Sequence, residues 1–391
     1  MANMLDYLVW RGELSMEASP WNAVDGLLIA TLSYLNIHGI RDAHGWTLRE
    51  AKRLDLLIDS PDSSFPPRKE AFNGMADSVR FGESRMHHFI AMTDELSSMQ
   101  FSAMCVDLPD GSMAVAYRGT DNTLVGWRED FDMAYRTWVP GQEAAGYYLA
   151  QAARCTDRPL RLVGHSKGGN LAVYAASVIH AEIQDRIESI WSYDGPGMNR
   201  QISAGTGYRR IKDRIRSYIP QSSIIGLLMD YYTPYTVVRS TASGLSQHDP
   251  MSWQVYGPKF EEMESIDRKA EIVCRTLHEW LQNSTPEQRG AFVDTMFKMA
   301  DTTNATRMSD ITNEKFRSLR KMYGGRKDID PETRRVFNRL IAQAVTLWFG
   351  NVVERVRGQK EEGVEERHWT TMAPGKPISG EDEKEPENDQ K

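Results

Sequence analysis

The chain lacks several features that define special classes of protein. Its 391 residues contain only three cysteines, Cys105, Cys155 and Cys274, and this small odd number excludes a disulfide-rich secreted scaffold. The three cysteines form no metal-ligand motif, so we expect no metal and no cofactor. No apolar run reaches the roughly 20 residues of a membrane-spanning helix, and the chain starts with neither a basic leader nor an apolar signal core. These absences together predict a protein of the reducing cytoplasm.

The chain also lacks a large excess of charge of either sign, except at its end. The formal net charge is −7, and residues 360–391 hold ten acidic against five basic residues, so the remainder is nearly balanced. A surface without a basic excess argues against nucleic acid as a partner. Residues 359–391 combine many charges with few large apolar side chains, and we expect an acidic, disordered tail there.

What the chain does contain is a strand, a sharp turn and a helix around one serine. Residues 160–172 read LRLVGHSKGGNLA, in which an apolar strand runs into Gly-x-Ser-x-Gly and a helical pattern follows. Gly164 and Gly168 leave room for a turn whose side chains would otherwise collide. The pattern is typical of the nucleophile elbow of serine hydrolases and predicts Ser166 as the nucleophile. The competing interpretation is a serine that only caps the helix.

A base for Ser166 should come late in the chain, after the nucleophile and the acid. Of the nine histidines, His248 has this position, in a loop after the strand-like segment 235–241. His165 lies next to the nucleophile in the sequence, and we expect its side chain to point away. The sequence therefore predicts His248 as the base, with a hydrogen-bonded loop histidine as the alternative.

The acid of a triad is less well defined by the sequence. Asp194 follows the strand-like segment 187–193, where its carboxylate could accept the imidazole N–H of the base. Asp230, after the apolar segment 224–229, is the rival. A turn role also suits Asp194, because Asp-Gly pairs favour tight turns. We predict Asp194, and leave open Asp230, another group, or a dyad without an acid.

Two donors are expected for the oxyanion of the tetrahedral intermediate. One is the backbone N–H of the residue after the nucleophile, Lys167. The other is Thr120, which ends a strand that is entered from strand 101–106 through the hairpin turn 109–111. Thr120 could donate both its N–H and its hydroxyl, and loss of one such donor typically lowers turnover by about 10² to 10³.

Together these motifs resemble the class 3, or fungal-type, lipases, and are more closely similar to an uncharacterised bacterial family of lipase-like hydrolases. The similarity rests on RGTDNTLVGW at 118–127 with Asp130, on GHSKGG, on the strand that ends in Asp-Gly-Pro-Gly, and on the late Gln-His pair. It covers about residues 5–255.

The resemblance implies an α/β-hydrolase fold with Ser166 and His248 as nucleophile and base. It also implies Thr120 as an oxyanion residue and a short lid near residues 122–131. No nucleic acid and no transmembrane segment are implied, although transient contact of the lid with a membrane surface is compatible with a lipid substrate.

The chain departs from this family pattern at two places. Class 3 lipases take their acid from a position that here holds Ser222 or Ser223, neither of which can replace a carboxylate. Lys167 stands where those lipases usually carry an apolar residue. A cation beside the nucleophile would favour substrates with a carboxylate or phosphate, and the alternative is a solvated lysine.

The hydrophobic patterns divide the chain into three parts. We expect a lipase-like α/β-hydrolase domain over residues 1–255, with a mostly parallel central sheet and a helical N-terminal region up to about residue 98. The apolar pattern over residues 256–358 predicts a helical C-terminal domain or cap, with helices near 260–283, 286–300 and 332–356. The acidic tail follows.

The predicted function is hydrolysis of carboxylic esters through a Ser-His-Asp triad and an acyl-enzyme. A lipid or lysophospholipid substrate is suggested by the resemblance alone. An acyltransferase would use the same triad. A catalytically weak hydrolase fold used for binding is the alternative from another class, and the missing class 3 acid favours it.

Overall fold

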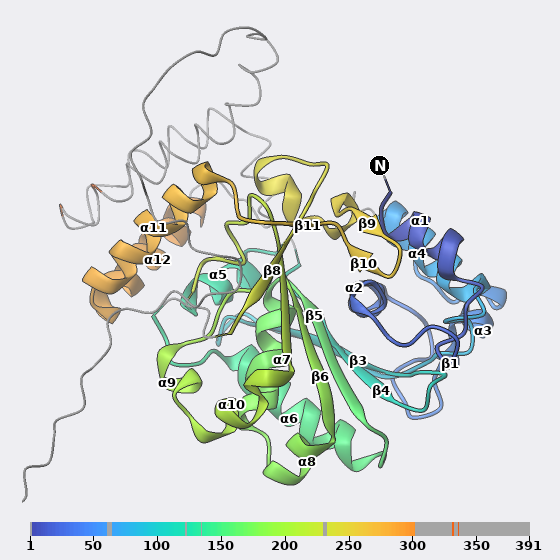
Figure 1. Ribbon diagram of the computed structural model, residues 1–391. Helices are drawn as coiled ribbons and strands as arrows, with labels where there is room; N and C mark the ends of the chain where they lie inside the picture. Colours follow the sequence, from blue (N-terminus) through green and yellow to red (C-terminus); the bar gives the residue numbers. More distant parts are fainter. Residues whose placement is uncertain are drawn as a thin grey trace, which may run out of the picture.

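The computed structural model describes residues 2–301, apart from 61–64, 122, 134 and 230–232, together with residues 331 and 335. Within this part of the chain the centre is a nine-stranded mixed sheet with strand order β1-β2-β3-β4-β5-β6-β7-β8-β11 (Figure 1). The strands are β1 Trp46–Thr47, β2 Arg85–Asp94, β3 Met99–Asp107, β4 Met113–Tyr117, β5 Leu160–His165, β6 Ile187–Tyr193, β7 Ile215–Pro220, β8 Tyr235–Val238 and β11 Glu262–Met263. Two further short strands, β9 Val255–Tyr256 and β10 Lys259–Phe260, form a separate hairpin.

The expectation of a mostly parallel sheet holds for the centre only. Strands β4 to β8 are parallel to one another, whereas β1, β2 and β3 run antiparallel up to β4, and β11 is antiparallel to β8. The antiparallel pairing of β2 with β3 and of β3 with β4 follows from their short connections, because a tight hairpin can join only antiparallel neighbours. Gly111, at φ 86°, makes the β3–β4 turn that the sequence predicts. The fold is an α/β fold.

Helices cover both faces of this sheet and so create two apolar layers (Figure 1). Helix α2 (Ala23–Leu32) packs on one face, and α6 (Pro140–Arg154) and α7 (Lys167–Val178) pack on the other. The remaining helices before β9 are α1 Met4–Arg11, α3 Leu48–Arg53, α4 Phe65–Asp77, α5 Leu124–Asp132, α8 Ala181–Arg186, α9 Arg200–Ser203 and α10 Thr206–Ile211. All ten residues of α2 are buried, as expected of a helix whose apolar residues surround it on every side.

The N-terminal region is not helical throughout, contrary to expectation. Four helices lead to β2, which begins at Arg85 and pairs with β3. Strand β2 is hidden in the sequence because a β-bulge between His87 and Ile90 breaks the alternation of apolar and polar residues. Helices α1, α3 and α4 lie beside α2 near this edge of the sheet (Figure 1).

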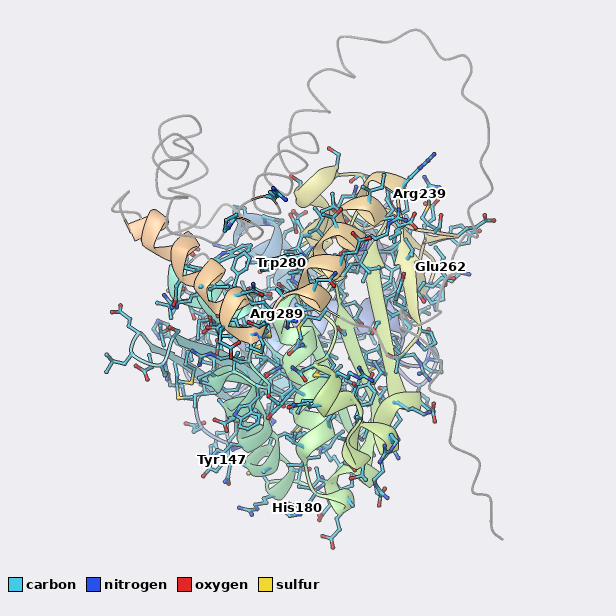
Figure 2. All side chains as sticks on the ribbon, turned by 90° about the vertical axis from the view of Figure 1, so that its left-hand side faces the viewer. Tyr147, His180, Arg239, Glu262, Trp280 and Arg289 are labelled. Carbon is cyan, nitrogen blue, oxygen red and sulfur yellow. The ribbon has the colours of Figure 1, made fainter. Side chains whose placement is uncertain are left out.

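One C-terminal helix begins at residue 286 as predicted, whereas the other begins at 268 instead of the predicted 260, because residues 259–260 and 262–263 form strands. Helices α11 (Arg268–Asn283) and α12 (Pro286–Asp301) lie together at one end of the molecule, far from Tyr147 and His180 (Figure 2). The sheet itself continues beyond Val255, because its edge strand β11 lies at 262–263. The expected helix at 332–356 and the acidic tail fall outside the described residues. No described helix combines the length and apolar character that crossing a bilayer requires.

Candidate functional site

Ser166 lies at the junction of β5 and α7, in a backbone conformation that few residues adopt. Its φ is 59° and its ψ is −136°, and its side chain makes no capping hydrogen bond to α7. A non-glycine residue in this region is strained and needs support from its surroundings. The interpretation of Ser166 as a simple helix cap therefore does not hold.

The glycines around Ser166 allow three backbone segments to meet at this turn. A Cβ on Gly164 would lie 2.1 Å from the carbonyl oxygen of Gly168, and one on Gly168 would lie 2.2 Å from that of Tyr117. A Cβ on Gly119 would lie 2.9 Å from the Cβ of Ser166. The end of β4 is thus packed directly against the serine, which brings residues 118–120 to the turn.

Asp194 and His248 form a hydrogen-bonded pair near the carboxyl end of β6. The Asp194 Oδ2 lies 2.6 Å from His248 Nδ1, and the two side chains are 1 % and 27 % exposed. The backbone of Asp194 has φ 49°, and its N–H donates to the carbonyl oxygen of Tyr218 at 2.7 Å. The rival acid, Asp230, lies outside the described residues.

The second carboxylate oxygen of Asp194 is held by the loop after β7. Ser223 Oγ donates to Asp194 Oδ1, and the Gly226 N–H donates to the same oxygen at 3.1 Å. Ser223 is one of the two serines expected at the position of the class 3 acid, and here it supports a carboxylate that follows the preceding strand.

The Ser166 hydroxyl and His248 are close in the fold but not bonded to each other. Both residues are described, and no hydrogen bond joins Ser166 Oγ to the His248 ring in this part of the chain. Hydrogen bonds of a catalytic site are often long without substrate and tighten in the complex.

The sequence predicts that the His165 side chain points away from the site, but in the structure it faces His248. Its Nε2 lies 2.8 Å from the carbonyl oxygen of His248, and the two rings are 4.6 Å apart between centroids. Because a carbonyl only accepts, Nε2 carries the proton and Nδ1 accepts from Tyr34 OH at 3.1 Å. Burial, with the nearby His248 as a smaller cause, lowers the pKa of His165 well below its usual range. His165 is thus a neutral group that ties the His248 backbone to the elbow.

Tyr34, from the segment after α2, links this histidine to the end of β4. The Gly119 N–H donates to Tyr34 OH at 3.1 Å, and burial raises the pKa of Tyr34 to about 12. The sequence does not predict these particular hydrogen bonds of Tyr34, because its partners lie more than 80 residues away.

Thr120 is next to the elbow, but its hydroxyl is already engaged. Thr120 Oγ1 donates to Asp130 Oδ2 at 2.5 Å, so only the backbone N–H remains for an oxyanion. Burial raises the pKa of Asp130 to about 6, and its other carboxylate oxygen is buried without a hydrogen-bond partner. Lys167 begins α7, so its N–H has no acceptor within the helix.

The Lys167 side chain neither faces a substrate nor lies in solvent. Its Nζ donates to Glu129 Oε2 at 2.9 Å, to the Gln100 carbonyl at 2.8 Å and to Gln100 Oε1 at 2.9 Å. Both ionic side chains are inaccessible, at 0 % and 1 % exposure. The expectation of a substrate-binding cation at this position is therefore wrong, because the charge is neutralised inside the protein.

The segment expected as a lid is the helix α5, and two neighbouring residues near its C-terminal end anchor it. Glu129 joins it to the elbow, and Asp130 joins it to Thr120. On its outer side α12 packs against it, with Phe131 and Phe297 6.1 Å apart between ring centroids and an ion pair between Arg128 and Asp294. Helix α12 therefore covers α5.

Comparison with solved structures finds lipases at low similarity. The M37 lipase is 16 % identical, with 52 % of this chain and 68 % of that chain covered and a TM-score of 0.33. A fungal lipase in complex with an inhibitor is 12 % identical, with 44 % and 70 % covered and a TM-score of 0.31. The extracellular lipase LipA from Serratia marcescens is 15 % identical, with 53 % and 40 % covered and a TM-score of 0.30. At such scores none of the three carries an argument about this chain.

Sequence comparison is more decisive than these structural similarities. Among curated proteins no relative matches significantly. The model of the Mbeg1-like family, however, matches residues 75–298, which include β2 to α11 and every candidate site residue named above except Tyr34. Since this match spans more than half of the sequence, the chain belongs to the Mbeg1-like family.

Proposed function

We propose that this protein is a serine hydrolase of carboxylic esters with an α/β-hydrolase arrangement, in which Ser166, His248 and Asp194 form the triad. The observation that carries the proposal is the strained backbone of Ser166 at a strand-to-helix turn, beside the 2.6 Å Asp194–His248 hydrogen bond. Strain of this kind is retained where function requires it. A purely structural serine would not need a buried acid–imidazole pair next to it.

The reaction would proceed in two halves, acylation of Ser166 and hydrolysis of the acyl-enzyme. In each half His248 takes up one proton and gives it back. His248 Nε2 takes the Ser166 proton as Oγ bonds to the ester carbon, and the carbonyl electrons move onto the oxyanion. Asp194 accepts the hydrogen bond from His248 Nδ1–H throughout and stabilises the imidazolium. Collapse of the tetrahedral intermediate breaks the bond between the ester carbon and the alcohol oxygen. The alcohol then leaves with the proton from His248. Water then repeats the sequence on the acyl-enzyme and releases the acid.

The backbone N–H groups of Lys167 and Thr120 are the proposed oxyanion donors. Neither side chain is needed for this role, because Lys167 pairs with Glu129 and the Thr120 hydroxyl pairs with Asp130. Donors that are held in place before the reaction lower its barrier most. The two buried contacts support the proposal because they fix the backbone on both sides of Ser166.

A lipid-like ester remains the proposed substrate class, and an acyltransferase would share every step up to the acyl-enzyme. The missing hydrogen bond between Ser166 and His248 favours the third possibility, a hydrolase fold used for binding. We propose a cytoplasmic location, which the three free cysteines support. The proposed domain layout keeps the helical C-terminal part as a cap over α5.

The test is covalent labelling by a fluorophosphonate probe, whose phosphorus reacts only with an activated serine. We expect the wild-type chain to be labelled and Ser166→Ala to remain unlabelled. Ser177→Ala is the matched control, since Ser177 is also buried on α7 and only bonds the Val173 carbonyl oxygen. Wild-type protein that is folded yet unlabelled would support the binding protein instead.

A further inference from the structure

Away from the candidate site, β2 and β3 gather three residues that commonly bind metals. One ring nitrogen of His87, one of His88 and the sulfur of Cys105 lie within 4.8 Å of one another. The sequence does not reveal this group, because Cys105 is distant from the histidines along the chain and pairs with His87 only in the strand register. We propose that His87, His88 and Cys105 form a zinc-binding site.

The backbone of β2 is distorted in the way that such a site requires. Successive residues of a strand normally point to opposite faces, so His87 and His88 should be separated by the sheet. The β-bulge after His87 and the left-handed φ of 51° at His88 bring both imidazoles to one place. Positive φ at a histidine costs of order 1 kcal/mol or more and is a feature from which function is inferred.

The bulge is held in place by its own hydrogen bonds. The His88 N–H donates to the Asp42 carbonyl oxygen at 3.0 Å, and the Phe89 N–H donates to that of Ile40 at 2.8 Å. The His88 carbonyl oxygen accepts from Tyr148 OH at 2.8 Å, and this hydroxyl also lies 3.3 Å from the Cys105 sulfur. The two rings are therefore built into the fold and are not a chance meeting of mobile side chains.

The imidazoles of His87 and His88 approach each other through their Nδ1 atoms. The Nδ1 atoms of His87 and His88 are 2.5 Å apart, closer than in an ordinary N–H to N hydrogen bond. A tetrahedral zinc ion with Zn–N bonds of about 2.0 Å needs its nitrogen ligands roughly 3.3 Å apart. A small opening of the rings would provide that spacing without any change of the backbone.

The other nitrogen of His87 faces a carboxylate, as in many zinc sites. His87 Nε2 is buried without a hydrogen-bond partner and lies 3.4 Å from Asp107 Oδ1. An Nε2–H directed at Asp107 leaves the Nδ1 lone pair free for a metal, and such a carboxylate orients the ligand. Asp107 is partly exposed and Arg158 lies 3.9 Å from its other oxygen, so the site has a route to solvent on this side.

The donor set selects zinc over hard cations. Two imidazoles and one thiolate suit a zinc ion, whereas magnesium and calcium prefer oxygen ligands. Cys105 would bind as the thiolate, so each ion bound releases one thiol proton to the buffer. Three protein ligands leave the fourth zinc position for water. Cys105 lies near the opposite end of β3 from Gln100, which contacts Lys167, so the site is separate from the proposed hydrolase centre.

The test uses cobalt(II) as a spectroscopic substitute for zinc in the untagged full-length chain. We expect one cobalt ion per chain, a thiolate-to-cobalt charge-transfer band in the near ultraviolet, and loss of the band when one equivalent of zinc is added. Cys105→Ser should abolish the band. Cys155→Ser is the matched control and should retain it, because Cys155 is exposed and outside the group.

A second variant keeps the test valid if Cys105→Ser does not fold. His88→Gly removes one ligand and places glycine, which accepts positive φ without strain, at the bulge. We expect His88→Gly to unfold at a higher temperature than metal-free wild type but to gain nothing from zinc, which should raise the wild-type Tm. A band that survives in Cys105→Ser or disappears in Cys155→Ser, or the absence of any thiolate band in wild type, would overturn the proposal.

Discussion

Lys167 and Glu129 form an ion pair that is closed to solvent, with Nζ and Oε2 2.9 Å apart. The lysine follows the candidate nucleophile in the sequence, and the glutamate belongs to α5. Glu129 also accepts from the Gln100 N–H at 3.0 Å and from the Gly141 N–H at 2.6 Å, so both of its carboxylate oxygens are hydrogen-bonded. The pair therefore joins the elbow, α5, β3 and the start of α6 in one buried network.

Removal of the Lys167 charge should destabilise the protein strongly. In Lys167→Met the Glu129 carboxylate stays buried without its counter-ion, which typically costs about 3–5 kcal/mol of unfolding free energy. The double variant Lys167→Met/Glu129→Gln should recover a large part of this loss. Urea denaturation of the variants measures it, and Lys52→Met, which breaks an exposed pair with Asp77, should cost less than about 1 kcal/mol.

The same variant also tests whether Lys167 selects substrates. Because its charge is neutralised by Glu129, the ratio of rates for anionic and neutral esters should be the same in wild type and in the folded fraction of Lys167→Met. A preference for anionic esters that disappears with the lysine would contradict the buried-pair interpretation.

Asp194→Asn should remove most of the labelling and ester hydrolysis while leaving the fold intact. The amide would hold His248 in the wrong tautomer and could not stabilise its cation, a change that lowers turnover by about 10⁴ in a serine protease. Ser223→Ala leaves the carboxylate in place but removes one hydrogen bond to Asp194 and one from the Gly226 N–H, and it should cost roughly tenfold. Equal losses in the two variants would show that the loop, and not the carboxylate, limits the reaction.

His165 should act as a positioning residue for His248. His165→Ala loses the N–H that holds the His248 carbonyl oxygen, and one such bond corresponds to about a tenfold slower probe reaction. His165→Gln keeps a side-chain N–H and should restore most of the rate. Because the pKa of His165 lies well below its usual range, the pH profile of the Gln variant should match that of wild type. A shifted profile would mean that His165 itself titrates in the reaction.

Asp130 should make the protein less stable as the pH rises from about 4 to about 6. Its carboxyl has a pKa of about 6 in the folded protein, against 3.8 ordinarily, so the folded state holds the proton more tightly. The favourable contribution is therefore complete below pH 4 and is lost as the pH rises through 6. Asp130→Asn lacks this term and should gain stability relative to wild type over that range, as measured by urea denaturation at pH 4 and pH 7. A constant difference between the two proteins would show that Asp130 has an ordinary pKa.

Much of the elbow and its surroundings could be predicted because the signals are local. A short apolar strand, two glycines spaced around Ser166 and an Ala-rich helical pattern follow one another within twenty residues, and β5 and α7 lie where this pattern predicts a strand and a helix. Helices α11 and α12 were predicted from their apolar stripes in the same way. Strand β2 was missed because its bulge interrupts the period on which strand prediction depends.

The sequence by itself determined the order and type of the central elements, the left-handed turn at Ser166 and the choice of residue types at the site. Only the tertiary structure decided that Lys167 is a buried partner of Glu129, that His165 faces His248, and that Ser223 supports Asp194. The physical reason is that turns and periodic patterns depend on neighbouring residues. Pairing and burial instead depend on which distant segments the sheet order brings together, and the three contacts join residues 38, 83 and 29 positions apart.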